Sequence, residues 1–228
     1  MNRQLQPLSR SPRYAFFDVD DTLISVKSML SFQDFWYQTY RDPEAEQRYR
    51  QDLTNHLHEG ACWSTLNRLY YRHFAGRRVT EVEQLGRQWF TRERKNPAFY
   101  HQSVVNQLRW HQARGDITVF VSGSFPALLH PIAEELQVDH TLAIQMEAAS
   151  GCYTGEILPP QTIGEGKAEA IRAFIQAIPV NLSECYAYGD DVSDLPMLSL
   201  VGYPRVIAGG RALEVHARQH GWPVLAPH

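Results

Sequence analysis

The chain has 228 residues, 43% of them hydrophobic, which suits one large domain or a core domain with a smaller insert. Its formal net charge is -3, whereas nucleic-acid-binding proteins usually carry a basic surplus, so nucleic acid is not expected as a partner. No apolar run reaches the ~20 residues of a membrane helix, so a membrane is not expected as a partner either. Three scattered cysteines favour reduced thiols, and the N-terminal stretch MNRQLQPLSRSPRY lacks the apolar region of a signal peptide. We therefore expect a cytoplasmic protein, either a monomer or a homodimer.

The first predicted element is a strand at residues 14–19. This short apolar run ends in the acids Asp18, Asp20 and Asp21. Such a pattern is typical of a buried parallel strand that carries polar groups at its carboxyl end.

A region of different character follows, from residue 25 to about residue 100. Apolar and aromatic side chains recur there at helical spacing, whereas runs of β-branched residues are few. We predict several amphipathic helices in succession, with breaks at Asp42-Pro43 and at Gly60.

Strands and helices alternate in the remainder of the chain. The expected elements are a helix opened by Asn96-Pro97 and ending near residue 111, a strand at 117–121, a helix at 126–136, a short strand at 141–144, a hairpin region at 152–157, a helix at 167–177, a strand at 185–188 and a last short strand at 204–207. This order predicts an α/β fold with a doubly wound, mainly parallel sheet. We divide the chain into a core domain of residues 1–26 and 100–228 and an inserted all-helical cap domain of residues 27–99.

Polar side chains follow three of the predicted strands. Asp18 and Asp20 follow the first strand, Ser122 follows the second, and Asp190 follows the strand at 185–188, whereas Lys167 opens a helix after a glycine-rich turn. Because ligands of parallel α/β sheets bind beyond the carboxyl ends of the strands, we expect these groups to meet. Clustered carboxylates repel each other unless a cation balances them, and Mg²⁺ prefers oxygen ligands.

Asp18 and Asp190 are therefore the candidate carboxylate ligands of Mg²⁺. Zinc is not indicated, because no set of cysteines and histidines has suitable spacing. A single Asp-x-Asp after a strand is also common in loops and helix caps, so the catalytic interpretation depends on the complete ordered set.

The ordered set resembles the haloacid dehalogenase superfamily of phosphotransferases. Its motifs are Asp18-x-Asp20-x-Thr22, then Ser122 after an apolar strand, then Lys167, then Gly189-Asp190-x-x-x-Asp194. The likeness covers residues 12–26 and 100–210, and the helical insert after the first motif is similar to the cap of the phosphoserine-phosphatase-like branch. It implies a Rossmann-like core.

The resemblance also implies a role for each motif residue. Asp18 would be the nucleophile and a metal ligand, and Asp20 would be the general acid and base, with its backbone carbonyl on the metal. Ser122 and the Gly123 N–H would bind the phosphoryl group, and Lys167 would bridge phosphate and Asp18. Asp190 would be a metal ligand, and Asp194 would support the metal, directly or through water. The implied activity is Mg²⁺-dependent hydrolysis of a small-molecule phosphate monoester through a phospho-aspartate on Asp18.

One position departs from phosphoserine phosphatases. These enzymes carry a Glu nine residues after the nucleophile, where it contacts the substrate ammonium, whereas this chain has Lys27. A lysine facing the site would disfavour phosphoserine and favour a substrate with a second anionic group, or one without an amine. The competing interpretation is a lysine that extends to solvent.

Three functions remain open at this stage. The first is a phosphatase, for which the resemblance allows histidinol phosphate, phosphocholine-like and sugar phosphates. The second is a phosphotransferase or mutase with the same aspartyl-phosphate chemistry, and the third is a degenerate member that acts by binding. Asp20, as a base for water, favours hydrolysis, and the complete motif set disfavours the third.

Overall fold

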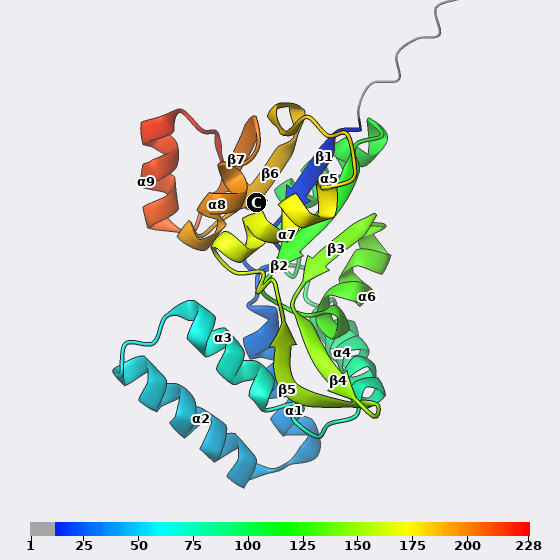
Figure 1. The fold of residues 1–228 in the computed structure, drawn as a ribbon, viewed down its shortest axis with the longest axis vertical. Helices are drawn as coiled ribbons and strands as arrows, with labels where there is room; N and C mark the ends of the chain where they lie inside the picture. Colours follow the sequence, from blue (N-terminus) through cyan, green and yellow to red (C-terminus); the bar gives the residue numbers. More distant parts are fainter. Residues whose placement is uncertain (1–11) are drawn as a thin grey trace, which may run out of the picture.

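The computed structural model describes residues 12–228. The N-terminal stretch in which no signal peptide was predicted therefore lies largely outside the described residues. Figure 1 shows a lobe built on a parallel sheet and, beside it, a lobe of helices with a two-stranded hairpin. Within residues 12–228, no helix is both long and apolar enough to cross a membrane.

In the described residues, the main sheet has six parallel strands in the order β3-β2-β1-β6-β7-β8. In that order they are β3 (His140–Ala143), β2 (Ile117–Ser122), β1 (Tyr14–Phe17), β6 (Tyr186–Gly189), β7 (Tyr203–Ile207) and β8 (Val224–Leu225). The chain moves from β1 to β2 and β3, and later strands are added on the other side of β1. This change of direction creates a topological switch point between β1 and β6, where ligands bind in open α/β sheets. The predicted α/β fold is confirmed.

Both faces of the sheet are covered, which explains the apolar character of β1. Tyr14 and Phe16 belong to one buried cluster and Ala15 and Phe17 to another, because successive strand side chains point to opposite faces. The first cluster contains residues of the helices α7 (Glu165–Ile175), α8 (Leu195–Leu198) and α9 (Arg211–His220), and the second contains residues of α5 (Gln102–Ala113) and α6 (Pro126–Leu136). Helices on both faces confirm the doubly wound arrangement (Figure 1).

The inserted region contains four helices. They are α1 (Ser28–Tyr40), α2 (Pro43–His58), α3 (Trp63–Arg72) and α4 (Val79–Glu93). The two predicted breaks are confirmed, since Asp42 caps α2 by accepting the Ala45 N–H and Gly60 lies between α2 and α3 with φ of 75°. The helices all fall within residues 27–99, and the domain boundaries themselves stay a prediction.

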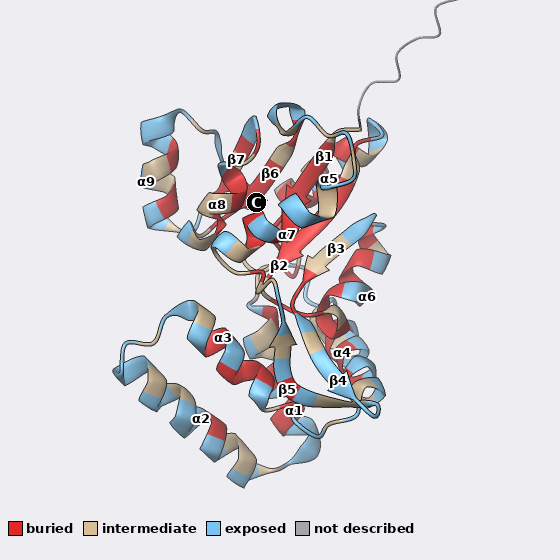
Figure 2. Cartoon of the chain, in the orientation of Figure 1, coloured by how far each residue is buried: buried red, intermediate tan, exposed pale blue. Residues whose placement is uncertain are grey.

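The predicted hairpin region is one strand of an antiparallel pair, β4 (Gln145–Ala149) and β5 (Cys152–Leu158). It packs against α3 and pairs with the insert through a bridge between Arg78 and Cys152. Figure 2 shows that the main sheet is largely buried, whereas α2 is mostly exposed. The lobe beside the core therefore consists of the insert and this hairpin.

One predicted helix start is wrong. Asn96-Pro97 does not open a helix, because the Asn96 side chain accepts the Ala98 N–H and its carbonyl accepts the Phe99 N–H, which closes a turn. The chain then returns to the core, where Tyr100 bridges Ile24, and α5 begins only at Gln102. The other predicted elements are present, with ends that shift by at most two residues.

Candidate active site

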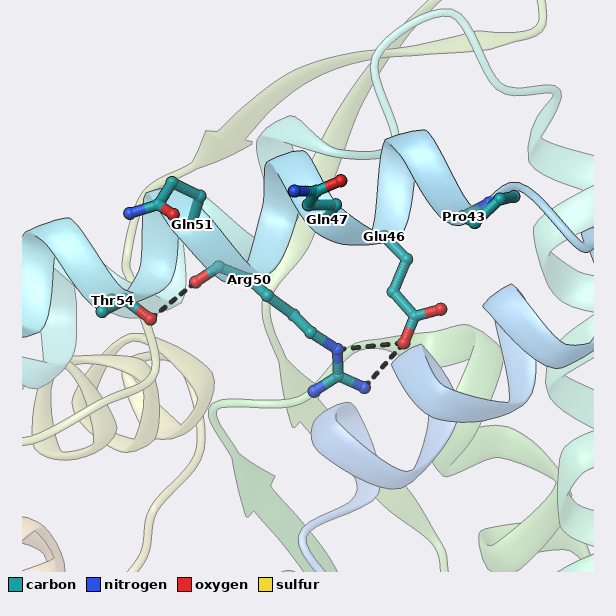
Figure 3. Close-up of a pocket in the computed structure, with 6 residues that line it drawn as sticks. All are labelled: Pro43, Glu46, Gln47, Arg50, Gln51 and Thr54. Atoms are coloured by element: carbon teal, nitrogen blue, oxygen red, sulfur yellow. Dashed lines mark hydrogen bonds and ion pairs between the residues drawn. The ribbon is translucent and has the colours of Figure 1, made fainter.

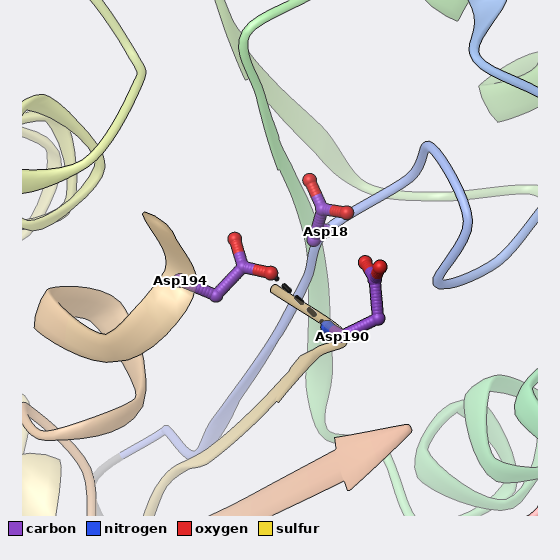
Figure 4. A group of neighbouring side chains, drawn as sticks. All are labelled: Asp18, Asp190 and Asp194. Atoms are coloured by element: carbon purple, nitrogen blue, oxygen red, sulfur yellow. Dashed lines mark hydrogen bonds between the residues drawn. The ribbon is translucent and has the colours of Figure 1, made fainter. Parts of the chain in front are cut away.

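Three buried carboxylates meet at the switch point of the sheet (Figure 4). Asp18 follows β1, Asp190 follows β6, and Asp194 ends the short 3-10 helix Val192–Asp194. One oxygen from each of the three lies within 4.8 Å of the others. The parallel pairing of β1 with β6, continued by a 2.9 Å hydrogen bond from the Asp18 N–H to the Tyr188 carbonyl, brings the strand ends together.

Lys167 adds an ammonium group to this cluster. Its Nζ lies 2.5 Å from Asp18 Oδ1 and 2.5 Å from Asp194 Oδ1, and the residue is only 3% exposed. Lys167 is the third residue of α7, and the start of that helix is held tightly, since a Cβ on Gly166 would lie 1.6 Å from the Gln161 carbonyl oxygen. Asp18, Asp190 and Lys167, three of the groups expected to meet, are therefore adjacent, and Asp194 lies with them.

The electrostatics of the cluster are unfavourable without a further cation. Burial raises the pKa of Asp18 well above its usual range, against the lowering effect of Lys167, and the neighbouring carboxylates raise it further. Burial and then Asp194 raise the pKa of Asp190 to about 6. Burial lowers the pKa of Lys167, but Asp18 and Asp194 outweigh it and keep the ammonium charged.

A divalent cation fits this arrangement. Three carboxylates against one ammonium leave two negative charges unbalanced in a buried space. The donors are oxygens, as Mg²⁺ prefers, and Asp190 is oriented by a 2.7 Å hydrogen bond from Thr22 Oγ1.

Asp194 has both carboxylate oxygens engaged by the protein. Its Oδ1 pairs with Lys167, and its Oδ2 accepts the N–H groups of Asp190 and Asp191 at 3.1 and 3.2 Å. A Cβ on Gly189 would lie 2.6 Å from this side chain, so only glycine leaves room for it. Asp191 caps the 3-10 helix by accepting the Ser193 N–H at 2.9 Å.

Asp20 lies apart from the three clustered acids and has unequal oxygens. Its Oδ2 accepts a hydrogen bond from Ser28 Oγ at 3.0 Å, whereas its Oδ1 is buried without a partner among residues 12–228. Burial raises the pKa of Asp20 to about 6, although Ser28 works in the opposite direction. A carboxyl group with such a pKa can hold and release a proton near neutral pH.

The loop after β2 is clamped from two sides. The Ser122 carbonyl accepts from Thr162 Oγ1 at 2.7 Å, and the Gly123 carbonyl accepts from Asn67 Nδ2 at 2.9 Å and from the Tyr71 hydroxyl at 2.8 Å. Both peptide groups that flank Gly123 are therefore fixed, one by the core and one by α3 of the insert. Such a rigid loop suits a backbone N–H that must bind an oxyanion.

Lys27 lies outside the carboxylate cluster. It is the N-cap residue of α1, its ammonium lies 2.8 Å from Asp21 Oδ2, and its side chain is 53% exposed. Burial lowers its pKa, but Asp21 outweighs this effect and raises it, with further contributions from Asp190 and Asp18. The Lys27 ammonium is thus charged, and it interacts electrostatically with Asp18 and Asp190 of the cluster. The side chain is also accessible to solvent.

Several residues at the site were not assigned a role from the sequence. They are Thr22, Ser28, Asn67, Tyr71, Ser124 and Thr162. Thr22 stands in the first motif, and Ser124 lies two residues after Ser122, so these two carried a local signal. The other four residues come close to the site only through tertiary packing, for which the sequence gives no local signal. The surface pocket in Figure 3 is lined by residues of α2 alone, and none of them belongs to this site.

Comparisons with known proteins place the chain in a family. A family model described as haloacid dehalogenase-like hydrolase matches residues 15–199. A probable phosphatase of Mycobacterium tuberculosis is 32% identical over 95% of this chain and 76% of its own length. A crystal structure of a protein of unknown function from Bordetella pertussis Tohama I is 27% identical and superposes with a TM-score of 0.85 over 96% of this chain and 100% of that one.

A structure of phosphoserine phosphatase, solved as a phospho-aspartyl intermediate analogue, is 17% identical, with a TM-score of 0.65 over 96% of this chain and 95% of that one. This likeness shows the fold. The predicted resemblance and the predicted enzyme class, a hydrolase of the phosphatase type, are confirmed by the family match and by the relatives. The chain belongs to the haloacid dehalogenase-like hydrolase family.

Proposed function

We propose that this chain is a Mg²⁺-dependent phosphatase that hydrolyses a small-molecule phosphate monoester through a phospho-aspartate on Asp18. The observation that carries the proposal is the buried convergence of Asp18, Asp190 and Lys167 at the switch point of the sheet. The similarity to a probable phosphatase supports the same activity.

The candidate metal ligands are the carboxylates of Asp18 and Asp190 and the backbone carbonyl of Asp20. Asp194, with both oxygens engaged by Lys167 and backbone N–H groups, would support the metal site by holding Lys167 and the Asp190 backbone in place. Bound Mg²⁺ would supply positive charge to the phosphoryl oxygens and allow the carboxylates to approach them.

The residues of the chain divide the chemistry between them. Asp18 attacks phosphorus through the carboxylate oxygen that Lys167 does not occupy, and the bond from phosphorus to the leaving oxygen breaks. Asp20 donates its proton to the departing alkoxide. The Asp20 carboxylate then takes a proton from water, the hydroxide attacks the phospho-aspartate, and inorganic phosphate leaves with Asp18 restored.

Three further groups would hold the phosphoryl oxygens. The Ser122 hydroxyl and the Gly123 N–H would donate hydrogen bonds to them, and Lys167 would bridge a phosphoryl oxygen and Asp18. Phosphoryl transfer spreads negative charge over three oxygens in its transition state, so fixed donors and a buried ammonium provide most of the catalysis. The clamped peptides around Gly123 support this role.

The first prediction concerns the nucleophile. Asp18→Asn should lower the rate of phosphate release from a panel of phosphate monoesters by at least ~10³-fold in the presence of Mg²⁺, because an amide cannot form the acyl phosphate. Asp52→Asn, an exposed change on α2, is the control and should keep full activity. Phosphate release that survives in Asp18→Asn would refute the mechanism. Transfer to an added alcohol in place of phosphate release would favour the phosphotransferase alternative.

The second prediction concerns the charge at Asp190. Folding raises the pKa of Asp190 from 3.8 to about 6. Between these two pH values, the folded state therefore binds more protons than the unfolded state. The stability that protonated Asp190 contributes is complete below pH 3.8 and is lost as the pH rises through about 6. In EDTA, Asp190→Asn should therefore raise the free energy of unfolding by about 1–3 kcal/mol at pH 7.5 relative to the parent, and much less at pH 4.5.

Urea unfolding at the two pH values, with and without Mg²⁺, measures this difference. Saturating Mg²⁺ should stabilise the parent and leave Asp190→Asn unchanged, because binding to the folded state alone shifts the equilibrium. Asp52→Asn should behave as the parent throughout. A metal response in Asp190→Asn equal to that of the parent would contradict the assignment of Asp190 as a ligand.

The third prediction concerns substrate charge. We expect Lys27 to favour substrates that carry a second anionic group, because its side chain is half exposed at the start of α1, although its contact with Asp21 reduces the attraction. In Lys27→Glu, kcat/KM for esters with a second anion should fall about 5–10-fold relative to esters with a neutral leaving group. An unchanged ratio across the panel would end this idea and return phosphoserine to consideration.

A further inference from the structure

The two oxygens of Asp20 are in different environments. Oδ2 accepts the Ser28 hydroxyl at 3.0 Å, and Oδ1 is buried with no hydrogen-bond partner in the described part of the chain. A buried acceptor without a partner costs free energy unless a ligand or water supplies one. One oxygen of the proposed general acid is thus committed to the protein, and the other is free for the reaction.

Ser28 belongs to a chain of buried hydroxyl groups. Its Oγ lies 2.8 Å from Ser124 Oγ, and the backbone N–H of Ser124 donates to Ser122 Oγ at 3.1 Å. Ser28, Ser122 and Ser124 are each no more than 1% exposed, so bulk water does not compete for these bonds.

The direction of these hydrogen bonds follows from counting hydroxyl protons. A serine hydroxyl has one proton to donate, so a Ser28 hydroxyl that donates to Asp20 must accept from Ser124. While Asp20 is ionised, the order is therefore Ser124 to Ser28 to Asp20 Oδ2. A proton on Oδ2 would reverse both serine hydrogen bonds, with Oδ2 donating to Ser28 and Ser28 donating to Ser124, whereas a proton on Oδ1 leaves both bonds unchanged.

We infer that Ser28 is a positioning residue that commits Oδ2 of Asp20 to a hydrogen bond and thereby assigns the transferable proton to Oδ1. The inference rests on the proposed function, in which Asp20 protonates the leaving group. When Oδ1 gives its proton to the departing alkoxide, the Ser28 hydrogen bond remains on the carboxylate that forms and stabilises it. Ser28 is the first residue of α1, so the insert aims the acid of the core.

The competing interpretation is that the Ser28–Ser124 contact only fastens the insert to the core. The two interpretations differ in how the rate depends on the leaving group. An aliphatic alkoxide needs a proton to depart, whereas p-nitrophenolate leaves without one. A positioning role therefore predicts a loss confined to aliphatic esters, and a fastening role predicts the same loss for both.

The experiment compares an aliphatic phosphate monoester that the parent hydrolyses with p-nitrophenyl phosphate. Single-turnover release of the alcohol or phenol, with Mg²⁺ and the full chain, isolates the first step from the later attack by water. In Ser28→Ala this step should slow about 10–100-fold with the aliphatic ester and less than about 3-fold with p-nitrophenyl phosphate, because correct proton transfer contributes roughly 10²–10⁴-fold. KM should change little.

Matched variants separate the hydroxyl from the fold. Ser28→Thr keeps a hydroxyl and should restore most of the rate, whereas Thr39→Ala removes an exposed hydroxyl from the same helix and should have no effect. Ser124→Ala removes the donor to Ser28 and should show a smaller loss with the same dependence on the leaving group. It provides the same test if Ser28→Ala does not fold.

Equal losses on both esters, or no loss on the aliphatic ester, would overturn the role of Ser28 and leave the phosphatase proposal intact. A parent enzyme that releases phosphate from no ester, or an Asp18→Asn variant that is fully active, would instead remove the proposed function and the role of Ser28 with it.

Discussion

The site depends on one buried ion cluster, in which Lys167 lies between Asp18 and Asp194. Removing charges from water costs several kcal/mol per ion, and the cost is recovered only with short contacts and further hydrogen bonds. Here the ammonium makes two contacts of 2.5 Å, and Asp194 also accepts two backbone N–H groups. This cluster fixes the start of α7 and the end of β6 relative to β1.

The excess of carboxylate over ammonium indicates that the cluster is a functional site. A purely structural ion cluster would be expected to balance its charges, whereas this one retains an excess of carboxylate. A divalent cation would balance this excess, and a phosphoryl group could bind through it. Perturbed carboxyl pKa values in a buried cluster are typical of functional sites, and the position at the switch point agrees with that.

The insert makes direct hydrogen bonds to the candidate site. Asn67 and Tyr71 of α3 hold the Gly123 carbonyl, and Ser28 of α1 holds Asp20. Each of these contacts joins the insert to a loop at a strand end of the core. Movement of the insert would therefore disturb the loop after β2 and Asp20 together.

The sequence predicted the part of this site that follows from local rules. Asp18, Ser122 and Asp190 end apolar strands, and parallel strands deliver their carboxyl ends to one edge, so their convergence could be inferred. The contacts of Ser28, Asn67 and Tyr71 could not, because they join segments up to 96 residues apart and depend on how the insert packs. The start of α5 was missed for a different, local reason, since a side-chain turn at Asn96 competes with a helix.

The most direct test of the central claim is a crystal structure of the protein with Mn²⁺ and beryllofluoride, a mimic of the phosphoryl group. The account predicts anomalous density for one Mn²⁺ between Asp18 and Asp190, and beryllofluoride bonded to the Asp18 oxygen that Lys167 leaves free. Mn²⁺ density elsewhere, or beryllofluoride without a bond to Asp18, would contradict it.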